Sequence, residues 1–141
     1  MANADRKRPE IILAGVMTDD LFSAWPFASK VLEPALDRGE TLEDLLTKLY
    51  RKEAQLWMIY DNGEQVAAVV TEIFPDNNGQ VCNIWAVGGT GINRWIGYLD
   101  TIEQWAKANG CSAVIIEKTR KGLQRLLRDY KVTHVTLGKD I

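Results

Sequence analysis

The chain has 141 residues, of which 46% are hydrophobic and 26% charged, a balance typical of one domain with its own core. No apolar run approaches the roughly 20 residues needed to cross a bilayer, and the apolar stretch behind the basic start is too short for a signal peptide. Two cysteines and one histidine cannot assemble a zinc site, so we expect reduced, buried thiols, no metal and a cytoplasmic location.

The formal charge of −2 is divided unevenly along the chain. Residues 1–76 carry eight Lys/Arg and fourteen Asp/Glu, a net charge of −6. Residues 77–141 carry nine Lys/Arg and five Asp/Glu, a net charge of +4. An anionic ligand is therefore expected to prefer the second half.

The folded domain is predicted to begin near Glu10. Residues 1–9 are expected to form a flexible tail, and residues 10–141 a single domain. The apolar run over residues 10–16 predicts a first strand.

Two helices are predicted after this strand. Thr18 or Asp19 is placed to cap the first, and Pro26 and Pro34 are expected to split or bend it. The segment Thr41-Leu-Glu-Asp44 resembles a capping box, and leucines at helical spacing follow it. This pattern predicts the second helix.

The middle of the chain predicts an antiparallel meander. Two β-rich runs, over residues 55–60 and 65–74, flank an Asn-Gly turn, which is a strong short-range signal for a hairpin. A second turn over residues 75–79 leads to a third strand over residues 80–87.

After Gly88-Gly-Thr-Gly91 the apolar spacing becomes helical. One helix is predicted over residues 92–109, followed by a strand over residues 111–117. Since this helix links two strands, they should lie parallel in a βαβ unit. A last helix near residues 123–130 and a last strand over residues 132–137 complete the order.

This order of elements resembles the GNAT superfamily of acyl-CoA-dependent N-acetyltransferases from about Glu10 onward. Residues 104–117 are similar to the family's central helix and fifth strand, and residues 126–137 to its fourth helix and the following strand. Overall length and two short phrases, residues 70–73 and 106–111, also resemble small GNAT-like proteins of tailed bacteriophages. The resemblance implies a single α+β domain with a mixed, mostly antiparallel central sheet and helices on both faces.

In this family, a Gln/Arg-x-x-Gly-x-Gly loop binds the pyrophosphate of coenzyme A through backbone amides at a helix N-terminus. The resemblance therefore implies acetyl-CoA as cofactor and a binding loop made of Val87, Gly88, Gly89, Thr90 and Gly91. The loop is degenerate, because Ala86 stands at the Gln/Arg position and the loop is shorter than usual. Arg94 is the candidate substitute for the missing clamp, and the alternative is an exposed helical arginine.

The family's general acid is a tyrosine on the fourth helix, and Leu127 stands at the matching position here. Tyr130 is the best remaining candidate for the acid, although its i+7 relation to Leu123 favours a core residue. Glu72 and Glu117 are the candidate bases. The alternative for Glu72 is a solvated carboxylate on a sheet edge.

Further features bear on partners. Lys118, Arg120, Lys121, Arg125, Arg128 and Lys131 form a basic segment, which fits a solvated helix face, a coenzyme A phosphate, an acidic protein or nucleic acid. Nucleic acid ranks last, because no stacking aromatic interleaves with these charges. Trp105 lies off the apolar stripe of its helix, and an exposed tryptophan there would indicate a protein contact.

Two functional hypotheses follow. The first is a GNAT-like, acyl-CoA-dependent N-acetyltransferase-type protein with a degenerate cofactor loop, acting on an amine and encoded by a phage. The second is a non-catalytic GNAT-like module that serves as a phage virion or assembly component or binds a host protein. The expected location is the cytoplasm, the host's if the protein is phage-encoded, or the virion. The sequence leaves open whether catalysis is retained.

Overall fold

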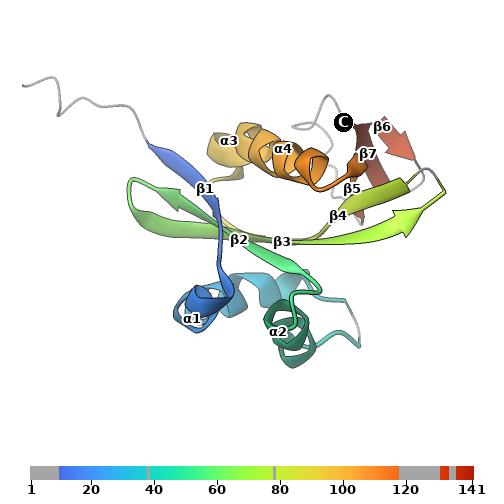
Figure 1. The fold of residues 1–141 in the computed structure, drawn as a ribbon. Helices are drawn as coiled ribbons and strands as arrows, with labels where there is room; N and C mark the ends of the chain where they lie inside the picture. Colours follow the sequence, from blue (N-terminus) through green and yellow to red (C-terminus); the bar gives the residue numbers. More distant parts are fainter. Residues whose placement is uncertain (1–9, 38, 78, 118–130, 134–135) are drawn as a thin grey trace, which may run out of the picture.

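A computed structural model describes residues 10–37, 39–77, 79–117, 131–133 and 136–141 (Figure 1). Its strands are β1 (Ile11–Gly15), β2 (Gln55–Asp61), β3 (Glu64–Asp76), β4 (Gly79–Gly89), β5 (Cys111–Glu117), β6 (Lys131–Thr133) and β7 (Thr136–Asp140). Its helical elements are η2 (Thr18–Asp20), α1 (Leu21–Leu32), η3 (Glu33–Ala35), α2 (Leu42–Tyr50), α3 (Ile92–Trp95), η4 (Ile96–Leu99) and α4 (Asp100–Ala108).

The strands form one sheet in the order β1-β2-β3-β4-β5-β7-β6. Only β4 and β5 pair in parallel, and the other neighbours are antiparallel. Helices α1 and α2 cover one face of the sheet, and α3 and α4 cover the other (Figure 1). The predicted mixed α+β architecture, with its βαβ unit, is confirmed.

The β2–β3 hairpin confirms the turn that its Asn-Gly pair predicts. Asn62 has φ 53° and Gly63 has φ 88°, so both turn residues are left-handed. A two-residue turn of this kind matches the twist of the flanking strands. The next turn places β4 antiparallel to β3, which completes the predicted meander.

The predicted cap of α2 is present. The backbone N–H of Asp44 donates to Thr41 Oγ1 at 3.0 Å, and Leu45 and Leu49 of the same helix are buried. The prediction for α1 was wrong, because Thr18 and Asp19 form the short turn η2 and neither side chain caps the helix.

Of the two predicted effects of proline on α1, splitting by Pro26 is not observed. Pro26 lies inside the continuous helix and does not split it. Its missing N–H would have bonded the carbonyl of Phe22, a residue that is 63% exposed, so water can satisfy that carbonyl. Pro34 lies in η3, directly after α1 ends, where the chain changes from an α-helix to a 3-10 turn.

The helix predicted over residues 92–109 is interrupted. It consists of α3, η4 and α4, and Gly97 lies in the tighter middle segment. The predicted apolar stripe survives this change, since Trp95, Leu99, Ile102 and Ala106 are buried. Trp105, which lies off this stripe, is partly buried and packs edge-on against Trp57 with ring centroids 5.2 Å apart.

At the C-terminal end, β6 and β7 form an antiparallel pair where the sequence predicted one strand. The helix predicted near residues 123–130 lies outside the described residues. Within the described ranges, no helix has both the length and the apolar character that crossing a bilayer requires.

Candidate functional site

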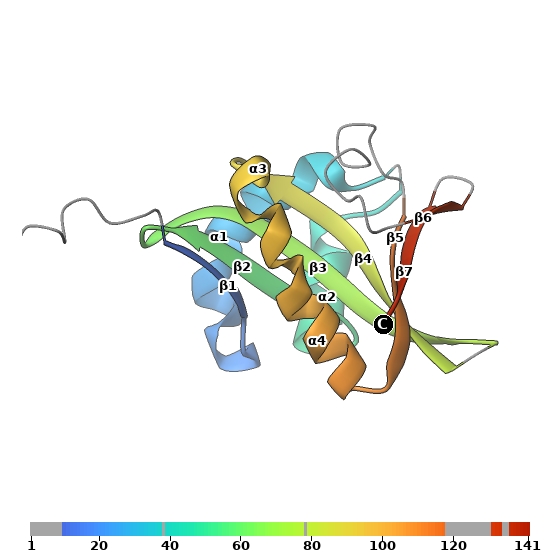
Figure 2. The same cartoon turned by 90° about the horizontal axis from the view of Figure 1, so that it is seen from above.

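The last part of β4 has a neighbouring strand on one side only, within the described structure. Its parallel pairing with β5 ends at Ile84 and Ile116, whereas its antiparallel pairing with β3 continues to Ala67 and Gly89. Seen from above, β4 and β5 diverge from this point (Figure 2). The segment from Trp85 to Gly89 therefore presents one edge that no described strand pairs.

A β-bulge accounts for this divergence. Val70 and Thr71 are consecutive in β3, but they pair with Ala86 and Ile84, so Trp85 is an extra residue in β4. A bulge bends its strand and increases its twist. It occurs at the residue where β4 leaves β5, so the bulge and the separation of the strands share one position.

The backbone groups on this edge can be assigned. The N–H of Thr90 donates to the carbonyl of Val66 at 2.9 Å, so Thr90 faces β3. Residues of an antiparallel ladder alternate between facing their partner and facing away. Gly88 therefore faces β3, and Val87 and Gly89 direct their N–H and C=O groups to the unpaired edge.

Two of the predicted loop glycines are strand residues with a packing role. A Cβ on Gly88 would lie 1.8 Å from the carbonyl oxygen of Val31 in α1. Gly89 has φ +119°, and its Cβ would lie 2.3 Å from the carbonyl oxygen of Val66. The predicted four-residue loop was thus too long, because both positions are needed for close approach to α1 and β3, and only Thr90 and Gly91 connect β4 to α3.

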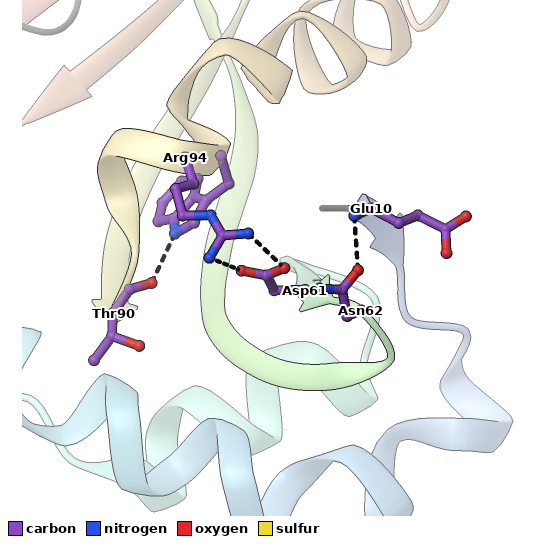
Figure 3. Close-up of polar contacts among 6 residues, drawn as sticks. Glu10, Asp61, Asn62, Thr90 and Arg94 are labelled. Carbon is purple, nitrogen blue, oxygen red and sulfur yellow. Dashed lines mark hydrogen bonds and ion pairs between the residues drawn. The ribbon is translucent and has the colours of Figure 1, made fainter. Parts of the chain in front are cut away.

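The short turn is held by its neighbours (Figure 3). Trp95 Nε1 donates to the carbonyl of Thr90 at 3.0 Å (Figure 3). The N–H of Arg94 donates to the carbonyl of Gly91 at 2.8 Å. Gly91 itself is left-handed, with φ 72°. Hydrogen bonds from Arg94 and Trp95 of α3, together with the bond from Thr90 to Val66 of β3, therefore hold the turn.

Arg94 binds the carboxylate of Asp61 with both guanidinium nitrogens, Nη2 to Oδ1 at 3.0 Å and Nη1 to Oδ2 at 2.9 Å (Figure 3). Its side chain is 48% exposed, and that of Asp61 is 14% exposed. The contact joins α3 to the β2–β3 hairpin, whose Asn62 also accepts the N–H of Glu10 at 2.9 Å. Sequence reasoning missed Asp61, since no local pattern pairs residues so far apart in the chain.

Glu72 belongs to a polar cluster on the α2 side of the sheet. Its carboxylate lies 3.7 Å from Lys48 Nζ and accepts from Asn83 Nδ2 at 3.5 Å. The ammonium of Lys48 lies 5.0 Å from the ring centroid of Trp85, and Trp85 Nε1 donates to Glu40 Oε2 at 3.1 Å. We call these five residues the Glu72 cluster, and Trp85 links it to the bulge.

The remaining predicted site residues are not brought together with this cluster. Tyr130 and the basic segment from Lys118 lie outside the described residues, apart from the backbone of Lys131. Glu117 is the last residue of β5. The roles predicted for Tyr130 and Glu72, and for Val87 to Gly91 and Arg94, stay predictions.

The two cysteines are free and buried, as the sequence predicts. Burial raises the pKa of the Cys82 thiol to about 12, and Cys111 adds to that rise. Burial also raises the pKa of Cys111. Both thiols therefore remain protonated and poorly nucleophilic at neutral pH.

Comparisons with known proteins identify the fold. No family model and no curated protein matches the sequence. Solved structures match at 13% identity: an agmatine N-acetyltransferase (TM-score 0.70, covering 93% of this chain and 99% of that one) and a polyamine N-acetyltransferase of Drosophila melanogaster (0.68, 94% and 100%). A predicted acetyltransferase of Clostridium acetobutylicum, solved with acetyl-CoA, is also similar (0.64, 89% and 92%). The chain therefore has the GNAT acetyltransferase fold.

Proposed function

We propose that this chain binds an acyl-CoA along the unpaired edge of β4 and is an N-acyltransferase-type protein acting on an amine. The observation that carries the proposal is the one-sided pairing of β4 from Trp85 to Gly89. An extended ligand with amide groups can pair with such an edge as an added strand does. The pantetheine arm of coenzyme A is a ligand of this kind, and Val87 and Gly89 offer it backbone groups.

The length of that arm fits the edge. About twelve bonds separate the pyrophosphate from the thioester sulfur, which corresponds to about four residues of extended chain, or roughly 13 Å. Gly89, the last residue of β4 before the turn, and Trp85 are also four positions apart in the sequence. A pyrophosphate bound at the Thr90–Gly91 turn, beside the first amides of α3, would bring the thioester to the bulge.

The chemistry required is modest. Acyl transfer needs a positioned thioester, a base for the amine and an acid for the departing thiolate. In this proposal Glu72 is the base, because its cluster contains Trp85, and Tyr130 is the acid. Val87, Gly88, Gly89, Thr90 and Gly91 form the cofactor segment, and Arg94 of α3, three residues after Gly91, is the candidate cation. The loop is degenerate in one respect: Ala86 is buried, so no polar clamp extends from that position.

Acetyl-CoA binding tests the proposal by thermal shift. Ligand at about 100 times its dissociation constant should add about 2.7 kcal/mol to the free energy of unfolding. Asn93→Glu places a negative charge in the first turn of α3, where it should weaken pyrophosphate binding without destabilising the helix. Glutamate at Gly89 is unsuitable, because that position has no room for a side chain.

Gln104→Glu is the matched control, since it adds the same charge to an exposed position of α4. The two positions are eleven residues apart, about 16 Å along a helix, which exceeds the Debye length of about 8 Å at physiological salt. A shift kept by Gln104→Glu and lost by Asn93→Glu supports the site. No shift at millimolar acetyl-CoA overturns the proposal.

The two-residue turn and the apolar Ala86 favour a second candidate function. It is a non-catalytic GNAT-like module, encoded by a phage, that acts in the virion or its assembly or binds a host protein. Co-purification with virions or with one host protein, combined with no acetyl-CoA binding, supports this candidate. Acetyl-CoA turnover with an amine excludes it.

A further inference from the structure

We propose that Lys48 is a self-acylation site of this protein, modified by the acyl-CoA bound at β4. The inference rests on the proposed function, because that function supplies the thioester. It goes further by assigning a chemical role to a lysine that neither the sequence pattern nor the fold marks as part of a site.

The position of Lys48 is the first observation. Helix α2 brings its ammonium to 5.0 Å from the ring centroid of Trp85 and 3.7 Å from Glu72 Oε2. An aromatic face and a carboxylate together form a site for a primary ammonium. The side chain is 43% exposed, so it retains freedom to move.

The second observation is the position of Trp85. This residue is the bulge, and it directly follows the last residue of β4 that pairs with β5. A pantetheine arm that starts beside Gly89 and spans about four residues of extended chain would place its thioester at Trp85. Lys48 Nζ is therefore held beside the expected acyl group by the residue that marks the end of the arm.

Among the described residues, no other lysine makes an ion pair with Glu72 or a cation–π contact with Trp85. Lys139 binds Glu103 at 2.9 Å, and Lys107 lies in the last turn of α4. Lys52 follows α2 in the chain and is exposed, so it provides a control for the ordinary chemical reactivity of a surface lysine.

The proposed reaction transfers the acyl group from the coenzyme A thioester to Lys48 Nζ. Glu72 takes one proton from the Lys48 ammonium, and the free Nζ electron pair forms an N–C bond to the thioester carbonyl. The C–S bond breaks, and its electron pair leaves on the coenzyme A sulfur. The nitrogen then loses a second proton, the sulfur is protonated to the thiol, and one proton in total is released. The products are an amide on Lys48 and free coenzyme A.

The test uses the full chain with acetyl-CoA, followed by intact-mass and peptide mass spectrometry over time. Acetyl-CoA binding is measured by thermal shift on the same sample. We expect Lys48 to be acetylated at least tenfold faster than Lys52 in the folded chain and at the same rate after unfolding in urea. The rate constant should not change on dilution of the protein, because the transfer occurs within one complex.

Variants separate a reactive lysine from a structural ion pair. Glu72→Gln keeps the shape of the side chain but removes the base, and should slow Lys48 acetylation by about 10². Lys48→Arg keeps the charge beside Trp85 and should abolish the modification while acetyl-CoA binding persists. Lys48→Arg also keeps the proposal testable if Glu72→Gln fails to fold, because the fast acetylation phase must then be absent from the intact-mass time course, which leaves only the slow reaction of residues such as Lys52.

Binding of acetyl-CoA with equal acetylation of Lys48 and Lys52 overturns this inference alone and leaves the proposed function intact. Lack of binding overturns both. A second-order dependence on protein concentration also overturns it, because the acyl group would then pass between molecules.

Discussion

Replacement of Gly88 by alanine tests how closely α1 lies against β4. The added Cβ would stand 1.8 Å from the carbonyl oxygen of Val31 and 3.3 Å from the amide nitrogen of Leu32. An ordinary contact needs about 3.4 Å, so the helix must move by about 1.5 Å. The φ angle of Gly88 is not left-handed, so the cost comes from packing and not from backbone strain.

The loss in free energy of unfolding can be estimated from the packing that the displacement of α1 disturbs. Overpacking costs about 1–3 kcal/mol, and Leu32, fully buried beside the contact, would lose part of its packing as well. We expect Gly88→Ala to lower the free energy of unfolding by about 3 kcal/mol. At roughly 2.1 cal/mol/K per residue, the melting temperature of a chain of this length should fall by about 10 °C.

Urea unfolding followed by tryptophan fluorescence measures this change, with the melting temperature as a second readout. Gly97→Ala is the matched control, because a Cβ there meets nothing within 4 Å. It should be neutral or stabilise by up to about 1 kcal/mol. If Gly88→Ala is as stable as the unchanged protein, α1 does not lie against β4 as described, and the packing role of this glycine is refuted.

Three further changes test other contacts by the same unfolding assay. Thr41→Ala should cost about 1 kcal/mol through loss of the α2 cap, and no loss would show that the bond to Asp44 contributes nothing. Asp61→Asn and Arg94→Met, combined in a double-mutant cycle, should give a coupling energy of about 1 kcal/mol, because the ion pair is bidentate but partly exposed. A coupling energy near zero would contradict this. The pKa of the Cys82 thiol is raised from 9.0 to about 12 in the folded chain, so between pH 9 and 12 the unfolded chain releases a proton that the folded chain keeps. The contribution of Cys82 to the free energy of unfolding is therefore complete below pH 9 and is lost as the pH rises from 9 towards 12. The slope of stability against pH should therefore be flatter in Cys82→Ala by up to about 1.4 kcal/mol per pH unit, and equal slopes would contradict the burial effect.

Local signals were sufficient for most of the fold. The Asn62-Gly63 turn, the Thr41 cap and the helical stripe through Ile102 each depend on neighbours in sequence, and the structure confirms all three. The parallel pairing of β4 and β5 followed from the helix between them. Features of this kind are readable because the chain itself sets their geometry.

The errors share a different cause. Gly88 and Gly89 were predicted as loop residues, whereas they are the last two residues of β4 and lie close to α1 and β3. A glycine in a sequence indicates close approach to the backbone, but it does not distinguish a bound ligand from a neighbouring helix or strand. The bulge at Trp85, the ion pair of Arg94 with Asp61 and the edge-on contact of Trp105 all depend on residues distant in sequence. No periodicity could have revealed them.

The central claim is that β4 beyond Ile84 offers an open edge to an acyl-CoA. Residue-resolved amide hydrogen exchange, measured with and without acetyl-CoA, tests it most directly. We expect the amide of Gly88, which faces β3, to exchange slowly in both samples, and the amide of Val87 to exchange quickly alone and slowly with acetyl-CoA. Slow exchange at Val87 before any ligand is added, or exchange there that acetyl-CoA leaves unchanged, would contradict the account.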